Sequence, residues 1–321
     1  MDDGFDVVGL QRPNNLYKKS QETFRLKKLE IFDQIDLQVV DLRDIKNVEN
    51  IFKSYKPNYF AHLGSQSNVK KSSEIKELTK ESNIEITKNI VDTIDQYSKD
   101  TIFFFPSSAT IYEGYENIEV DEITKPLPKT EYAKSKLISQ NYIFNKINEN
   151  DLQLNTGIMF SHESEFRRSE FFTKKITKFL VDYKKNGNIS LKVGNIFIDR
   201  DIGYAPEYVD AIYKIIKTNN RENYIVSSNK LNKLNEFINY CLEMLEIDYE
   251  LLVDGKTVSY LDKKNNYEFI SSEENEFRDY DLVGIKGNNN KILRDLNWSP
   301  KVGLNEISKI MVDYELKNKA I

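Results

Sequence analysis

The chain has 321 residues, of which 39% are hydrophobic and 12% aromatic, so it can bury one large core or two modest ones and is not a disordered protein. Its 46 basic and 51 acidic side chains are interspersed and sum to a net charge of -5, which argues against nucleic-acid and membrane-surface partners. The single cysteine, Cys241, lies in an apolar helical pattern and is interpreted as a buried core thiol, so no disulfide framework can form within the chain. No apolar stretch is long enough to span a bilayer, and the expected location is the cytoplasm.

Short apolar runs alternate with helical periodicity through the first half of the chain. Strands are predicted at 6–10, 37–42, 59–63, 102–105 and 155–160, and helices at 48–55, 84–97 and 132–147. This alternation is typical of a parallel sheet that helices cover on both faces. We therefore predict an α/β fold whose residues 1–160 form a Rossmann-like, doubly wound parallel sheet that binds a nicotinamide nucleotide.

After about Ser161 the pattern changes to helices with short strand-like pieces between them. Helical spacing is found at 171–184, 205–217, 234–245 and 304–314. This part, residues 161–321, is predicted to form mainly a smaller C-terminal substrate-binding lobe that shares a cleft with the sheet domain, with some segments returning to the sheet.

Tyr132 and Lys136 stand four residues apart at the start of a predicted helix, and therefore on one face of it. An ammonium group there lowers the pKa of a phenol and makes tyrosine a usable general base. The chain contains four Tyr-x-x-x-Lys pairs, but only this one follows, one loop later, a strand that runs into Ser107 and Ser108. Taken alone, these serines would be interpreted as a turn or cap. Ligands of open α/β sheets bind beyond the carboxyl ends of strands, so we expect Ser108 beside the Tyr132 phenol.

At these residues the sequence resembles the extended short-chain dehydrogenases, which carry a Ser or Thr at such a strand end and Tyr-x-x-x-Lys on the next helix. The resemblance covers nearly the whole chain and is greatest to the GDP-mannose 4,6-dehydratases. The segments that carry it are 39–44, 62–69, 157–164, 173–176, 200–203, 276–278 and 296–300.

The resemblance implies that Ser108 hydrogen-bonds the sugar 4-hydroxyl, that Tyr132 is the base and that Lys136 holds the nicotinamide ribose. It implies NADP as cofactor, with NAD as the alternative, a GDP-sugar as substrate, and a homo-oligomer, either dimer or tetramer; no metal ligand is assigned. The remaining cofactor positions are Arg12, Asp41, Leu42, Gly64, Ser65, Gln66 and His162. The positions that face the substrate diphosphate and ribose are Lys175, Arg200 and Arg278. Arg12 is equally interpretable as a solvated surface residue, and for each of the three cations taken individually a surface salt bridge is the commoner role.

One departure from the family concerns its glycine-rich turn. The family begins with a strand and a Gly-x-x-Gly-x-x-Gly turn that admits the cofactor pyrophosphate onto a helix N-terminus, and none of the 12 glycines forms that pattern. Residues 6–10 resemble the family's second strand, so the first βα unit is expected to be missing.

The second departure concerns acid–base chemistry. The dehydratases place a Glu two residues after the catalytic hydroxyl, where this chain has Thr110, and residues 107–112 resemble the nucleotide-sugar 4-epimerases. Glu113 is a candidate substitute acid or base, although a loop-surface carboxylate is the simpler interpretation. The sequence thus predicts dehydratase chemistry on a GDP-sugar. The alternatives are a GDP-sugar 4-epimerase or 4-ketoreductase, and a truncated or catalytically idle partner subunit.

Overall fold

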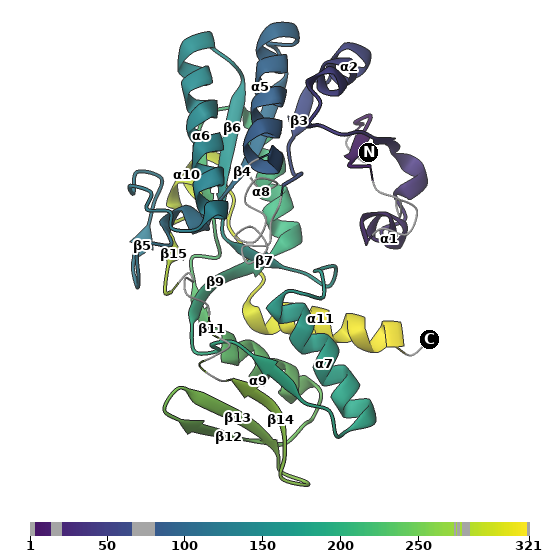
Figure 1. Ribbon diagram of the computed structural model, residues 1–321, viewed down its shortest axis with the longest axis vertical. Helices are drawn as coiled ribbons and strands as arrows, with labels where there is room; N and C mark the ends of the chain where they lie inside the picture. The colour runs from purple at the N-terminus through teal and green to yellow at the C-terminus, as the bar shows by residue number, and fades with distance from the viewer. Residues whose placement is uncertain are drawn as a thin grey trace.

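The computed structural model describes residues 4–13, 21–65, 81–272, 274, 277 and 283–319. Figure 1 shows a parallel sheet flanked by long helices and, below it, a second group of strands beside α7, α9 and α11. The fold is the predicted mixed α/β architecture with a parallel sheet.

Four parallel strands form the main sheet in the order β10-β6-β4-β3, which run over Asn223–Val226, Leu154–Met159, Ile102–Ser108 and Tyr59–Ala61. Helices α2 (Ile45–Tyr55), α5 (Ile86–Tyr97) and α6 (Glu131–Asn150) lie on one side of it, and α8 (Ala205–Thr218) lies on the other (Figure 1).

Strand β4 is apolar at successive positions because both of its faces are covered. Phe103 and Phe105 pack into the cluster formed with α2, α5 and α6, whereas Phe104 packs with side chains of α8 on the opposite face. All three phenylalanines are at most 1% exposed. A strand that is buried on both sides shows a continuous hydrophobic run instead of alternation, as this one does.

Two further strands, β1 (Val8–Gln11) and β2 (Asp36–Val39), pair in parallel as a separate sheet that helix α1 (Gln21–Lys28) accompanies. Within the described residues β1 pairs only with β2, and β3 pairs only with β4. The usual order of a doubly wound sheet places the first strand between the second and the fourth. If β1 is the second strand, as the sequence predicts, the strand order leaves that place open between β1 and β3.

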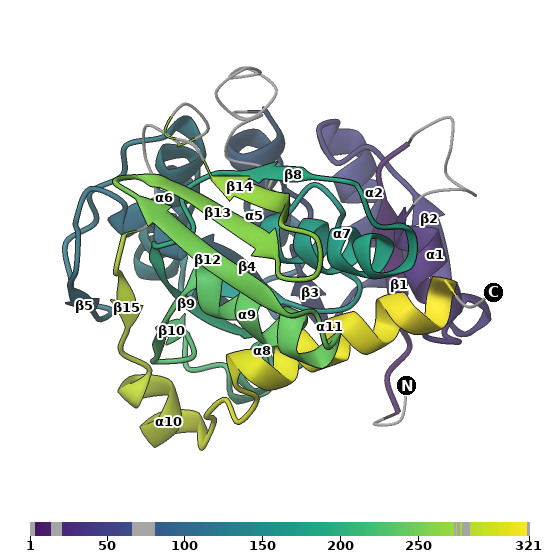
Figure 2. The same ribbon diagram turned by 90° about the horizontal axis from the view of Figure 1, so that it is seen from below.

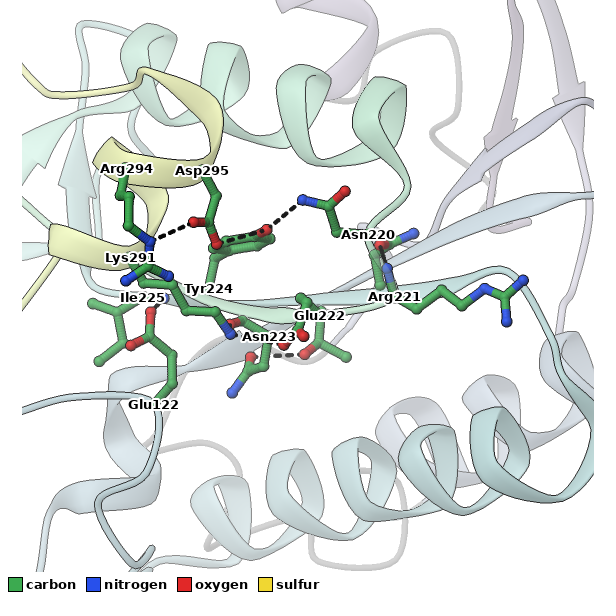
Figure 3. A network of polar contacts seen from close by, with 12 residues as sticks. Glu122, Asn220, Arg221, Glu222, Asn223, Tyr224, Ile225, Lys291, Arg294 and Asp295 are labelled. Atoms are coloured by element: carbon green, nitrogen blue, oxygen red, sulfur yellow. Dashed lines mark hydrogen bonds and ion pairs between the residues drawn. The ribbon is translucent and has the colours of Figure 1, made fainter.

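The outer edge of β10 is closed by side chains from other segments (Figure 3). Glu122 Oε1 accepts the backbone N–H of Ile225 at 2.8 Å. Lys291 of the short helix α10 (Asn290–Leu296) donates to the Asn223 carbonyl at 2.9 Å and pairs with Glu222 at 2.8 Å. These contacts satisfy polar groups that an open strand edge would otherwise present to other chains.

The C-terminal lobe has its own sheets and its own core. One sheet has the order β12-β13-β14-β8, over Tyr249–Asp254, Thr257–Asp262, Tyr267–Ser272 and Leu191–Val193. Another, β11-β9-β7, runs over Leu231–Lys233, Asp199–Tyr204 and Ser161–Glu163, and a bridge pairs β15 (Lys286–Gly287) with β5 (Glu119–Val120). The lobe core lies between these strands and α7 (Phe172–Asn186), α9 (Leu234–Met244) and α11 (Leu304–Lys319). Cys241 is fully buried in that core as a free thiol.

Helix α11 connects the C-terminal lobe with the N-terminal unit formed by β1, α1 and β2. In Figure 2 it runs from the lobe toward β1 and α1. The Glu315 carboxylate forms an ion pair with Lys174 of α7, and both side chains are at most 10% exposed. Lys174 Nζ also donates to the Glu165 carbonyl at 2.6 Å. At the far end of the helix, Asn318 accepts a hydrogen bond from Lys28 of α1 at 3.1 Å.

Replacing Glu315 by Leu is expected to lower the free energy of unfolding by roughly 3–5 kcal/mol, because it leaves the Lys174 ammonium buried without a counter-charge. The double variant Lys174→Met/Glu315→Leu should recover most of the loss, since an apolar pair then replaces both charges. Urea unfolding of the three proteins measures both effects. If the single and double variants lose the same free energy of unfolding, the pair contributes through the shape of its side chains and not through their charge.

Candidate active site

Ser108 is the last residue of β4 and the N-cap of a short 3₁₀ turn, Ala109–Tyr112. Its Oγ accepts hydrogen bonds from the Thr110 backbone N–H at 3.3 Å and from the Thr110 hydroxyl at 3.0 Å. With both acceptor positions occupied, the Ser108 proton is left to point elsewhere. The Tyr132 phenol lies close enough for the Ser108 hydroxyl to lower its pKa.

Tyr132 and Lys136 lie in the first turns of α6, whose N-cap is Thr130. The Tyr132 side chain is 8% exposed and Lys136 is 2% exposed. Lys136 Nζ donates to the Pro106 carbonyl at 2.8 Å and to the Ser65 hydroxyl at 3.2 Å, and it lies 5.9 Å from the centre of the Tyr132 ring. The structure therefore brings together Ser108, Tyr132 and Lys136 from two elements that the sequence had predicted to meet.

The other three Tyr-x-x-x-Lys pairs lie elsewhere. Tyr142 contacts Asp92 of α5, Tyr213 is on the exposed side of α8, and Tyr260 is buried in the lobe core, where its hydroxyl donates to Asn239 at 3.0 Å. None of these contacts involves Ser108.

Burial governs the ionisation of the pair. It raises the pKa of the Tyr132 phenol, and the nearby Ser108 hydroxyl and the charge of Arg167 offset part of that rise. It lowers the pKa of the Lys136 ammonium to about 7. The two oxygen atoms that Lys136 contacts are neutral, so neither of these contacts compensates the buried charge as a carboxylate would.

The residues predicted to meet the adenosine end of a cofactor follow β1 and β2. Asp41 accepts hydrogen bonds from the Arg43 guanidinium at 3.0 Å and from its backbone N–H at 3.1 Å. These bonds lower the pKa of Asp41, and the positive charge of Arg12 lowers it further, which places Arg12 near the same carboxylate. Leu42 is partly buried against the core on the α5 side of the sheet.

The residues predicted to pass the nicotinamide end follow β3 and β6. Gly64 and Ser65 lie just after β3, and Ser65 reaches Lys136 as described, whereas Gln66 lies outside the described residues. His162 in β7 contacts the Phe160 carbonyl through Nδ1 at 2.8 Å, and its ring lies 5.0 Å from that of Tyr208. Burial lowers the pKa of His162 to about 4, so its imidazole is neutral at pH 7.

Two of the three predicted substrate cations are described. Lys175 is an exposed residue of α7 whose Nζ donates to the Lys192 carbonyl of β8 at 3.0 Å. Arg200 lies in β9 opposite Asn232 of β11. Arg278 lies outside the described residues, so its position relative to the other two stays a prediction.

Sequence reasoning assigned no role to Arg167 or Glu163. Arg167 is close enough to Tyr132 for its charge to lower the phenol pKa, and its guanidinium stacks on Phe171 at 3.7 Å. Its Nε lies 3.2 Å from a Glu163 oxygen, and the Thr173 hydroxyl donates to the same oxygen at 2.6 Å. The paired Arg after Phe-Ser-His-Glu-Ser was the available signal, but only the fold shows which of the two arginines approaches the phenol.

A second feature beside α6 is a concavity of about 370 Å³. It is lined by Leu137, Gln140, Asn141 and Phe144 of that helix, by residues 122–126, and by Glu222, Asn223 and Lys291. Ser108, Tyr132 and Lys136 are not among the lining residues, so this concavity is separate from their cluster. In the described part of the chain no group of three or more His, Cys, Asp or Glu side chains is placed to hold a metal ion. No helix in that part is long and apolar enough to cross a membrane.

Comparisons with known proteins agree on one family. The family model described as GDP-mannose 4,6 dehydratase matches residues 1–311. The GDP-mannose 4,6 dehydratase of Drosophila melanogaster is 27% identical over 292 residues, which cover 89% of this chain and 73% of that protein.

Solved structures agree on the fold. A dTDP-glucose 4,6-dehydratase from Streptomyces venezuelae with NAD bound has a TM-score of 0.81 at 14% identity, covering 99% of this chain and 90% of its own. The protein named RMD from Pseudomonas aeruginosa, complexed with NADPH, has a TM-score of 0.76 at 14% identity, covering 98% and 100%. At these identities the likeness shows a shared fold only.

The depressed pKa of Lys136 predicts how stability changes with pH. The folded-state pKa of about 7 lies below the ordinary value of 10.5, so the unfolded chain binds more protons between these limits and stability should rise with pH across them. One such group contributes a slope of up to ~1.4 kcal/mol per pH unit. Urea unfolding at pH 7, 8 and 9 should show this rise in the native chain and its absence in Lys136→Met. Identical slopes would mean that Lys136 stays charged in the folded state.

Proposed function

The chain belongs to the GDP-mannose 4,6-dehydratase family, and from this membership we propose that it oxidises a GDP-sugar at C4 with NADP and then eliminates water across C5 and C6. The observation that carries the proposal is the approach of Ser108 and of the Lys136 ammonium to the Tyr132 phenol in one buried cluster. A bound nicotinamide would take a hydride from C4 and return it to C6.

The residues beside the phenol suit the nicotinamide half of such a cofactor. Lys136 is a buried cation whose two contacts are neutral oxygens, which suits ribose hydroxyls as further acceptors. His162 donates through Nδ1 to the Phe160 carbonyl when it carries the proton there, which leaves Nε2 as an acceptor for a carboxamide N–H. Arg12 near Asp41 supports NADP over NAD, because a guanidinium suits a 2′-phosphate. Residues 1–321 contain no Gly-x-x-Gly-x-x-Gly turn, which is the usual partner of the cofactor pyrophosphate.

The chain's own groups account for the proton transfer at C4. Tyr132 takes the proton of the sugar 4-hydroxyl, and the Lys136 ammonium stabilises the phenolate that must form first. Ser108, whose hydroxyl lies beside the phenol, donates a hydrogen bond to the reacting oxygen. In the same proposal Lys175, Arg200 and Arg278 bind the diphosphate of the nucleotide sugar. A homo-oligomeric state and a cytoplasmic location also belong to the proposal.

Thr110 favours a second candidate. Elimination of water requires a group that removes the C5 proton and protonates the leaving 6-hydroxyl. The Thr110 hydroxyl instead donates to Ser108, and an aliphatic hydroxyl is too weak an acid and too weak a base to act as a general acid or base at neutral pH. A GDP-sugar 4-epimerase or 4-ketoreductase needs only the chemistry at C4, so it is the alternative that this residue supports.

The variant Thr110→Glu separates these candidates. In a protein extended at its N-terminus by a strand and glycine-rich turn, GDP-mannose should transfer its C4 hydride to NADP yet yield little 4-keto-6-deoxy product. Thr110→Glu should raise product formation by roughly 10²-fold or more, because positioned acid–base groups contribute about that much. Thr110→Gln introduces a side chain of the same size as Glu but without an ionisable proton, so it should not raise product formation. Rapid dehydration by the unaltered extended protein would show that Thr110 carries no mechanistic weight.

Cofactor affinity tests the departure at the glycine-rich turn. A polypeptide of residues 1–321 is expected to bind NADP weakly in titration calorimetry, because the sequence supplies no turn for the pyrophosphate. The extended protein should bind it at least tenfold more tightly. Tight binding by residues 1–321 alone would contradict the expectation, and weak binding by both proteins would favour the idle partner subunit.

A further inference from the structure

Glu113 has contacts that neither acid–base chemistry nor a surface position explains. The residue follows the 3₁₀ turn that starts at Ser108, and it is only 8% exposed. Its Oε1 accepts the backbone N–H groups of Lys129, at 2.7 Å, and of Thr130. Its Oε2 accepts the Thr130 hydroxyl at 3.3 Å. Both oxygens of the carboxylate are therefore engaged by residues 16 and 17 positions later in the chain.

These donors form the N-terminus of the helix that carries Tyr132. Thr130 is the N-cap of α6, and its Oγ1 accepts the Ala133 backbone N–H at 3.2 Å while it donates to Glu113. A helix N-terminus has backbone N–H groups without helical partners and a partial positive charge, so a buried carboxylate there is stabilising. Tyr132 is the second residue of this helix.

The two segments that Glu113 joins are pressed closely together. The Gly114 N–H donates to the Leu127 carbonyl at 2.9 Å, and the Leu127 N–H donates to the Ile111 carbonyl at 2.7 Å. A Cβ atom at Gly114 would lie 2.4 Å from Leu127 Cγ and 2.6 Å from the Leu127 carbonyl oxygen. One of these segments begins at Ser108 and the other ends at the start of α6, so their junction sets where the phenol lies relative to the serine.

We propose that Glu113 is a positioning residue, whose carboxylate anchors the N-terminus of α6 so that Tyr132 is held against Ser108. This inference rests on the proposed function for the identity of the reacting pair. Glu113 then exchanges no proton with the substrate. An acid or base at this position would have to give up its contacts with Lys129 and Thr130 in each catalytic cycle.

Two replacements of Glu113 distinguish anchoring from acid–base chemistry. Gln keeps an oxygen that accepts both backbone N–H groups, and its amide can donate to Thr130 Oγ1, so Glu113→Gln should keep the rate of C4 hydride transfer to NADP within about threefold of the native rate. Glu113→Ala removes the anchor and should lower kcat by roughly 10–100-fold with little change in KM, because small misplacements of reacting groups have effects of that order. Glu116→Ala removes an exposed carboxylate of the same loop and serves as the matched control.

The Ser108→Ala background tests whether Glu113 acts through the Ser108–Tyr132 contact. If the anchor serves that contact, Glu113→Ala should lower kcat by a smaller factor in Ser108→Ala than in the native protein. A purely structural defect would lower both rates by the same factor, and that result would overturn the proposal.

Hydrogen exchange of the peptide over residues 126–136 reports on the anchor without any turnover. Glu113→Ala should speed exchange of the Lys129, Thr130 and Ala133 amides, whereas Glu113→Gln and Glu116→Ala should not. If Glu113→Gln lowers kcat by about 10²-fold or more while amide exchange keeps its native rate, Glu113 belongs to the acid–base chemistry and the anchor is refuted. A native kcat together with native amide exchange in Glu113→Ala would also refute the anchor. If the unaltered extended protein does not transfer the C4 hydride to NADP, the proposed function fails instead. The amide exchange rates then show whether the anchor itself exists.

Discussion

Because β4 is buried on both faces, polar side chains can leave it only where the strand ends, and the reaction centre depends on this constraint. Phe103, Phe104 and Phe105 fill the sheet on either side. Pro106 has no N–H for the ladder, and its carbonyl receives the Lys136 ammonium. Ser108 is the last residue of the strand, and its hydroxyl lies beside Tyr132 of α6. The geometry of the phenol, the ammonium and the serine follows from where the apolar run stops.

The sequence was sufficient to place the central sheet and this cluster, because the signals involved are local. A continuous apolar strand and a helical repeat identify β4 and α6, and the strand end and the helix start fix Ser108 and Tyr132 without knowledge of the loops between them. The family was inferred from matching segments along nearly the whole chain, and the α/β fold from the alternation of strands and helices; both were confirmed.

Contacts that depend on the path of a loop could not be predicted. The carboxylate of Glu113 meets residues 16 and 17 positions later, so its surroundings exist only once the segment at 114–129 has folded back. Arg167 approaches Tyr132 for a similar reason, after the turn that follows β7. Helix α10, of seven residues, was also missed, because a segment so short has little periodicity and is held by contacts such as Lys291 with Glu222.

The position of α11 has a consequence for how the protein folds as it is synthesised. This helix follows every other described element in the chain, yet it pairs Glu315 with Lys174 in the lobe and Asn318 with Lys28 in the N-terminal unit. While the ribosome still holds α11, Lys174 is without its carboxylate partner and the lobe core lacks one wall. Domains that emerge earlier generally fold first. Here, however, the lobe core is complete only after α11 has left the ribosome, so its final packing waits for the last of the described helices.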